Sequence, residues 1–170
     1  LNSDNIDCLL IRDHNTVGLS GANAEQRQKS VWRALTHSDG VTQKGDGSAG
    51  SYGIGKSAPF ACSSFRTVFY NSYSIEDKLK AFQGVSRLVS HYDSQDRQTQ
   101  GVGYFQKYDD LKGGSPIFEQ DPCKLRDKFA RTDYGTDVII AGFKKSKTWE
   151  EDIEKAVIAN FFVAIHNEDL

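Results

Sequence analysis

Four segments of the chain have strand-like lengths: those at 65–73, 81–92 and 101–108 alternate apolar and polar residues, and the one at 135–143 holds three consecutive aliphatic residues. This alternation, with many β-branched and aromatic residues, is typical of half-buried strands. Several of these segments are joined by short connections, and strands joined in this way pair antiparallel. The sequence therefore predicts an α/β (α+β) fold, a two-layer sandwich of a mostly antiparallel mixed sheet with helices on one face.

A shorter apolar run at 7–13 ends at an aspartate, which suits a buried strand that delivers a carboxylate at its C-terminal end. Helical spacing at 24–40 places Val31, Trp32 and Leu35 on one side. A short helix is expected from Lys56, between a glycine-rich loop and the strand at 65–73.

The C-terminal segment predicts the clearest helix of the chain. Thr148 and Glu151 have the spacing of a capping box, and the helix is expected to turn an apolar stripe toward the core, formed by Ile153, Val157, Phe161 and Ile165. By contrast, the polar segment 109–132 predicts a surface excursion with one helical turn around 123–129.

Composition limits the classes of function. The chain has 170 residues, 38% of them hydrophobic, which favours a single domain at 1–170. A formal net charge of −2 gives no signal for binding nucleic acid or an anionic membrane. Three widely spaced cysteines support neither a disulfide framework nor a zinc site, so a reducing, cytoplasmic location is expected. Because methionine is absent even at position 1, we expect a fragment of a longer protein.

The segment from Gly50 to Ser57 matches G-x-x-x-x-G-K-S, the consensus of a phosphate-binding P-loop. A P-loop follows a buried, aliphatic strand, but 37–49 holds one aliphatic residue larger than alanine, Val41, among polar residues and glycines. The pattern matches while its context does not, so a P-loop NTPase is kept as an alternative.

Three pieces, in this order, resemble the Bergerat-fold (GHKL-type) ATP-binding domain: IRDHNTVGLSG, GSYGIGKSAPFA and YGTDVII. Gyrase-type topoisomerases, MutL proteins, ninety-kilodalton heat-shock chaperones, sensor histidine kinases and MORC-type ATPases share that fold. The resemblance implies an ATP-binding domain of an ATPase, in which closure of a lid at about 37–56 is coupled to changes in partner domains.

The resemblance assigns roles to the first and third motifs. Asp13 matches the aspartate that accepts a hydrogen bond from the adenine amino group, and Gly18 the glycine that lets the backbone approach the base. Thr136 matches the threonine that holds the aspartate and adenine through a shared water. The spacing after Asp13 is one residue longer than in the family, and Asn15 takes roughly the place of the first glycine.

In the second motif, Gly50, Gly53 and Gly55 match the lid glycines, with Ile54 between two of them. Lys56 would add a cation beside the phosphates and Ser57 a hydroxyl. The resemblance thus implies ATP or ADP with Mg²⁺ as cofactors. Its implied partners are other domains of the parent protein or a second copy of the chain.

The family's catalytic helix, with a glutamate base and an asparagine four residues later that binds Mg²⁺, has no counterpart here. None of the glutamates is followed at that spacing by asparagine. The parent protein is expected to be an ATPase, and this chain to show weak hydrolysis or none. A non-catalytic interaction module with the same fold is a further alternative.

Overall fold

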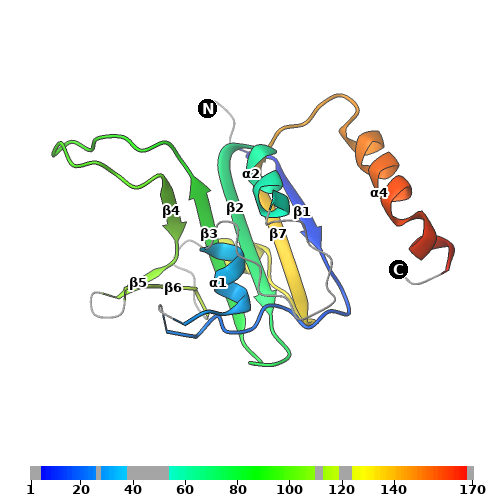
Figure 1. Cartoon of the computed structure of the whole chain (residues 1–170), viewed down its shortest axis with the longest axis horizontal. Helices are drawn as coiled ribbons and strands as arrows, with labels where there is room; N and C mark the ends of the chain where they lie inside the picture. Colours follow the sequence, from blue (N-terminus) through cyan, green and yellow to red (C-terminus); the bar gives the residue numbers. More distant parts are fainter. Residues whose placement is uncertain (1–4, 26–27, 38–53, 110–112, 119–123, 168–170) are drawn as a thin grey trace.

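The computed structural model describes residues 5–25, 28–37, 54–109, 113–118 and 124–167. A five-stranded antiparallel sheet forms its centre, in the order β1-β7-β2-β3-β4, and β5 and β6 form a separate two-stranded sheet (Figure 1). The elements in chain order are β1 (Cys8–Arg12), α1 (Val31–Thr36), the 3₁₀ helix η1 (Ile54–Ser57), α2 (Ala58–Ala61), β2 (Ser63–Tyr73), β3 (Lys80–Arg87), β4 (Val102–Phe105), β5 (Lys107–Asp109), β6 (Gly113–Ser115), α3 (Leu125–Lys128), β7 (Gly135–Phe143) and α4 (Trp149–His166). The predicted mixed α and β fold with a mostly antiparallel sheet is confirmed.

One face of the sheet, here called the helix face, packs against α1 and α2. Val68 of β2 lies opposite Val85 of β3, and directly opposite residues of antiparallel strands point to the same side. Both are buried in one cluster with Trp32 of α1 and Phe60 of α2. The sequence placed Val31, Trp32 and Leu35 on one side of a helix; Trp32 is buried and Leu35 packs against the cluster, whereas Val31 is 38% exposed.

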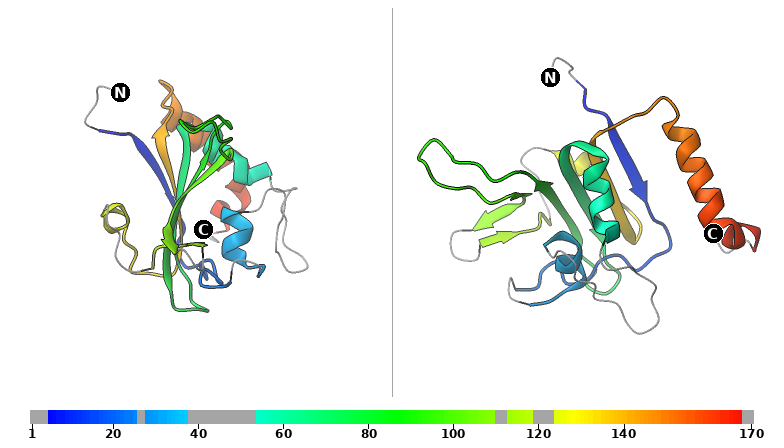
Figure 2. Two further views of the ribbon diagram at one scale, coloured as in Figure 1. Left: turned by 90° about the vertical axis from the view of Figure 1, so that its left-hand side faces the viewer. Right: turned by 45° about the horizontal axis from the view of Figure 1, so that its top comes forward.

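The opposite face carries a second cluster. Phe82 and Ile139 are both fully buried, and Ile117 bonds to Phe82 through two backbone hydrogen bonds of 2.8 and 2.9 Å. Leu125 and Phe129 pack against this cluster, so α3 lies across the sheet from α1 (Figure 2). The predictions of helices on one face only and of a surface excursion at 109–132 are therefore wrong, whereas the helical turn predicted around 123–129 is confirmed as α3. Three apolar residues of that polar segment, Ile117, Leu125 and Phe129, belong to this cluster or pack against it.

β1 is found where the sequence predicted a strand, but the prediction that it is buried is wrong. It pairs with β7 alone and forms an edge of the sheet. Leu10 and Ile11, on opposite faces, are 40% and 52% exposed. Apolar composition therefore located this strand correctly without indicating which of its faces is covered.

Two other predicted strands differ in extent. The strand expected at 81–92 ends at Arg87, and the one expected at 101–108 divides after Phe105 into β4 and β5, which belong to different sheets. At the division, the side-chain amide of Gln83 donates to the side-chain oxygen of Gln106 at 2.6 Å. This polar contact lies where continuous alternation predicted an uninterrupted strand.

α4 forms where the sequence predicted the C-terminal helix, yet its apolar stripe does not face the core. Ile153, Val157, Phe161 and Ile165 are between 41% and 51% exposed. The ring of Trp149 packs edge-on against Phe143, with 5.4 Å between ring centroids, at the start of the helix. The capping box is also absent, because the Thr148 hydroxyl bonds to Asp152 rather than to the helix backbone. Among the described helices, none has both the length and the apolar content to cross a bilayer.

Candidate functional site

Asp13 directly follows β1, and its carboxylate is held from one side by the start of β7. The backbone N–H of Asp13 donates to the carbonyl of Thr136 at 3.1 Å, and the N–H of Thr136 donates to Oδ1 of Asp13 at 2.5 Å. The side chain is 43% exposed. Among the described residues, the contacts of the carboxylate go to Oδ1 and none goes to Oδ2.

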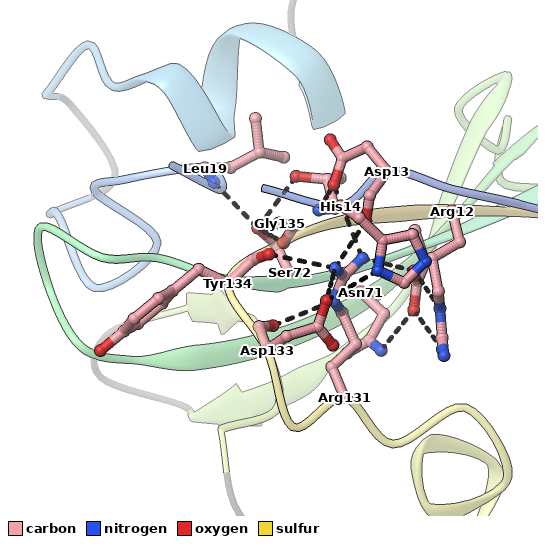
Figure 3. Close-up of polar contacts among 12 residues, drawn as sticks. Arg12, Asp13, His14, Leu19, Asn71, Ser72, Arg131, Asp133, Tyr134 and Gly135 are labelled. Atoms are coloured by element: carbon pink, nitrogen blue, oxygen red, sulfur yellow. Dashed lines mark hydrogen bonds and ion pairs between the residues drawn. The ribbon is translucent and has the colours of Figure 1, made fainter. Parts of the chain in front are cut away.

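The backbone after Asp13 is bound to the same place through Ser72 of β2. The N–H of Leu19 donates to Ser72 Oγ at 2.8 Å, and Ser72 Oγ lies 3.1 Å from Thr136 Oγ1 (Figure 3). Gly18 has a φ of +69°, and a Cβ at this position would clash with the carbonyl of Tyr73. The fold thus brings Asp13, Gly18 and Thr136 together, although Gly18 is required here by a close backbone approach within the chain.

The two residues after Asp13 point outward. Asn15 has a φ of +57°, a left-handed conformation that asparagine tolerates better than most residues. Asn15, which was expected at roughly the place of the family's first glycine, therefore has a backbone conformation that favours glycine. The exposed His14 ring lies 3.0 Å from a carboxylate oxygen of Asp133.

Gly135 separates the Asp13 carboxylate from a buried arginine. Its φ is +138°, and a Cβ there would meet both Oδ1 of Asp13 and the guanidinium of Arg131. Glycine is the residue that permits this conformation and this approach together. The Gly-Thr dipeptide singled out in the sequence thus has a physical role for each member.

Arg131 lies beneath Asp13 with a side chain only 1% exposed. One terminal nitrogen, Nη2, donates to the carbonyl of Asp13 at 2.7 Å, to Oδ2 of Asp133 at 3.1 Å and to the carbonyl of Tyr134 at 3.2 Å. The other, Nη1, donates to Oδ1 of Asp137 at 2.6 Å. In Figure 3 the dashed contacts converge on this guanidinium, while the Tyr134 ring points away from it.

Asp137 has no exposed side-chain surface, and its charge is balanced by two arginines. Arg12 of β1 donates from Nε to Oδ1 at 2.9 Å and from Nη2 to Oδ2 at 3.0 Å, and Asn71 donates to Oδ2 at 3.0 Å. The hydrogen bond to Asp137 is the main reason that the pKa of Arg12 is raised above its ordinary value. A buried carboxylate is tolerated when it is paired and hydrogen-bonded in this way.

Asp133 completes the cluster at the surface. Partial burial is the largest single influence on the pKa of its carboxyl and acts to raise it. Hydrogen bonds from its own backbone and from His14, together with the positive charge of Arg131, outweigh burial, so the pKa is lowered from its ordinary value. Asp133 is therefore a second anion in contact with the Arg131 guanidinium, on the opposite side from Asp137.

Of the residues predicted for the lid, Gly50 and Gly53 lie outside the described residues, and Ile54, Gly55, Lys56 and Ser57 form η1. The ammonium group of Lys56 donates to the carbonyl of Ala34 at 2.5 Å, and the hydroxyl of Ser57 accepts from Arg87 at 2.9 Å. A Cβ at Gly55 would meet nothing within 4 Å. No contact within the described residues connects η1 with Asp13.

His37 stands at the end of α1, next to the segment predicted as the lid. Its ring stacks on Tyr104 with 4.6 Å between ring centroids, and its Nδ1 lies 2.7 Å from the Thr36 hydroxyl. Burial, and secondarily the charge of Arg33, lowers the pKa of His37 to about 4. The ring is therefore neutral at pH 7.

The described residues contain no group of three His, Cys, Asp or Glu side chains placed to hold a metal ion. A cavity of about 730 Å³ is lined by Trp32, Arg33, Phe118 and neighbouring residues, but not by Asp13, Gly18 or Thr136.

Sequence reasoning missed Ser72, Arg131 and Asp137. Ser72 was hidden in a strand pattern, and Arg131 in a segment that looked like a polar loop. Asp137 gave a usable signal, because a charged residue directly before consecutive aliphatic residues in a predicted strand needs a buried partner. Nothing in the sequence indicated that this partner would come from six residues upstream and from β1.

Comparison of the chain with family models, with curated proteins and with solved structures gave no match.

Proposed function

We propose that this chain is the adenine-nucleotide-binding domain of a Bergerat-type ATPase, with Asp13 as the acceptor for the adenine amino group. The observation that carries the proposal is the half-exposed Asp13 carboxylate at the end of β1. Oδ1 is held by the Thr136 N–H, while Oδ2 makes no contact among the described residues. An exocyclic amino group is a donor of the kind that such an oxygen accepts.

The surface next to Asp13 suits a flat, partly apolar ring. Ile11 lies in β1 two residues before Asp13, and Val138 lies opposite Ile11 in β7. Ile11 is 52% exposed, so this apolar surface is accessible beside the carboxylate. Thr136, which is partly buried and lies two residues before Val138 in β7, adds a hydroxyl on the same side of that strand. Small-molecule sites commonly combine apolar walls with a few fixed polar groups.

The P-loop alternative has less support. P-loops are built on parallel sheets, and the strand pairs of the described residues are all antiparallel. The Lys56 ammonium group, which would reach phosphate in a P-loop, donates to the Ala34 carbonyl. The interaction-module alternative differs from the proposal in predicting no nucleotide affinity.

Hydrolysis by this chain alone is expected to be weak or absent. A general base must lie within hydrogen-bond reach of the attacking water, and the sequence offers no E-x-x-x-N pair to supply that base and a magnesium ligand. We therefore assign nucleotide binding, and no hydrolytic step, to the residues of this chain.

Calorimetric titration with ADP and Mg²⁺ tests the proposal. We expect wild-type protein to bind and Asp13→Asn to lose affinity by about tenfold or more, because the amide nitrogen cannot accept a hydrogen bond. Asp7→Asn is the matched control, since Asp7 lies beside the other end of β1 with 62% exposure. Under the P-loop alternative Lys56→Ala would be the damaging change instead. Equal binding by wild type and Asp13→Asn would overturn the proposal.

A further inference from the structure

Arg131 has the properties of a residue that fixes the geometry of another one. It is almost completely buried, yet it contacts three carboxylates, at 3.6 Å for Asp13, 3.1 Å for Asp133 and 2.6 Å for Asp137. It also bonds to the backbone carbonyls of Asp13, Asp133 and Tyr134. A buried guanidinium with this many directed bonds allows little movement of the groups around it.

These bonds act on Asp13 from two directions. Nη2 of Arg131 holds the Asp13 carbonyl at 2.7 Å, which fixes the backbone where β1 ends. The Thr136 N–H holds Oδ1, and Nη1 of Arg131 approaches the same oxygen at 3.6 Å. With the backbone and one carboxylate oxygen both held, the direction of the remaining oxygen, Oδ2, is also determined.

Arg131 is in turn anchored by groups that do not touch Asp13. Asp137 is held by Arg12 and Asn71, and it receives the Nη1 bond of Arg131 on the face opposite the helix face. The carboxylate of Asp13 is therefore supported through the sheet by a network spanning β1, β2 and β7. Such support keeps a binding group in one orientation before the ligand arrives.

We propose that Arg131 is the positioning residue that makes the Asp13 site select a 6-aminopurine over a 6-oxopurine. The inference rests on the proposed function, since it assumes that Asp13 meets the base. A fixed Oδ2 accepts from an amino group at position 6 but opposes an oxygen there, since two acceptors then face each other. A carboxylate free to turn would relieve that conflict, and the selectivity would be lost.

The structure offers a matched pair of arginines for the test. Arg12 and Arg131 both donate to Asp137, but only Arg131 bonds to Asp13. Lysine keeps the positive charge while losing the planar fork of donors. Arg131→Lys should therefore free Asp13 to move. Arg12→Lys should weaken the hydrogen bonding of Asp137 while the bonds that hold Asp13 remain.

The experiment measures the dissociation constants of ADP and of inosine diphosphate, which carries an oxygen at position 6, for wild type and both variants. We expect wild type and Arg12→Lys to prefer ADP by about tenfold or more. In Arg131→Lys, ADP binding should weaken about tenfold while inosine diphosphate binding stays within about twofold. A residue that only stabilised the fold would change both affinities alike, and that result would overturn the inference.

Two further arms keep the test decisive. If Arg131→Lys fails to unfold cooperatively in urea, Asp133→Asn loosens the guanidinium more mildly and should weaken ADP binding about twofold to threefold with inosine diphosphate binding unchanged. In the Asp13→Asn background, Arg131→Lys should leave the ratio of the two affinities unaltered. Wild-type protein that does not bind ADP overturns the proposed function, whereas wild-type selectivity that persists in the Arg131 variants overturns only the role of Arg131.

Discussion

The segment around Arg131 and the helix α4 differ in how many contacts they make with the rest of the fold. Arg131 lies in a segment with little regular structure, yet its side chain bonds to β7, to the end of β1 and to the intervening turn. α4 is the longest described helix, yet no residue of it is buried. Regular local structure and tertiary attachment are therefore independent properties in this chain.

The difference shows where the stability of the molecule should reside. In the Arg131 cluster, removal of one partner leaves a buried charge without its counterpart, which is costly. In α4, a large apolar side chain can be removed with little loss of buried surface. Substitutions in the two regions should thus have effects of very different size.

The largest effect is expected for Asp137→Asn, which leaves Arg12 and Arg131 facing a neutral group. We expect a loss of about 3–5 kcal/mol in the free energy of unfolding, measured by urea denaturation. Asp7→Asn, which breaks an exposed ion pair with Lys145, should cost less than about 1 kcal/mol. Equal losses for the two variants would contradict the importance of the buried cluster.

Gly135→Ala tests the same cluster without changing any charge. A Cβ at this position would push against Asp13 and Arg131, and alanine disfavours a φ of +138°. We expect a loss of about 2–3 kcal/mol in the free energy of unfolding. Gly103→Ala is the control, because its Cβ would meet only the Ser86 side chain, at 3.9 Å. A fully stable Gly135→Ala protein would show that Asp13 and Arg131 can separate freely.

His37 is partly buried, and the pH dependence of stability tests how well its ring is packed. Its pKa is about 4 in the folded chain, below its ordinary value of 6.5, so the unfolded chain binds more protons between these values. The contribution of His37 to the free energy of unfolding is therefore fully present above pH 6.5 and is lost as the pH falls toward 4. We expect a decrease of about 1–2 kcal/mol, reduced by partial exposure to solvent.

The control for His37 is His37→Phe, which retains an aromatic ring to stack on Tyr104. The difference in unfolding free energy between wild type and this variant should change between pH 6.5 and pH 4. A constant difference across that range would mean that the folded chain does not disfavour protonation of His37.

The smallest effect is expected in α4. Phe161→Ala removes a side chain that is 51% exposed and should change the free energy of unfolding by no more than about 0.5 kcal/mol. Phe82→Ala, at a fully buried position, should cost about 3–5 kcal/mol. A large cost for Phe161→Ala in the isolated chain would show that α4 is packed, and would remove the contrast between the two regions.

The same contrast explains what the sequence could predict. Alternation located β2 and β3, a run of three aliphatic residues located β7, and helical spacing located α4, because these patterns depend on neighbouring residues. The same patterns could not indicate that α4 leaves its stripe exposed or that β1 is an edge strand, since burial depends on which other segments arrive. The small cluster of Ile117, Leu125 and Phe129 was overlooked for this reason.

The candidate site shows a similar division. Asp13, Gly18 and Thr136 were predicted from short motifs. In the fold Thr136 bonds to Asp13, and Ser72 links Thr136 to Leu19, the residue after Gly18. Arg131 belongs to no motif. Its partners are Asp137, 6 residues away along the chain, and the Asp13 carbonyl, 118 residues away. Motifs therefore identified the residues facing the proposed ligand, while the residues supporting them depended on tertiary structure.

The most direct measurement is an amide NMR titration of the full chain with ADP. Binding at Asp13 predicts that the largest shifts occur at the N–H groups of Leu19, Gly135 and Thr136, with little change at Asp96 on the distant loop between β3 and β4. Shifts centred on Trp32 and Phe118, which line the separate cavity, would place the nucleotide elsewhere and contradict the account. Absence of any shift at saturating ADP would contradict nucleotide binding altogether.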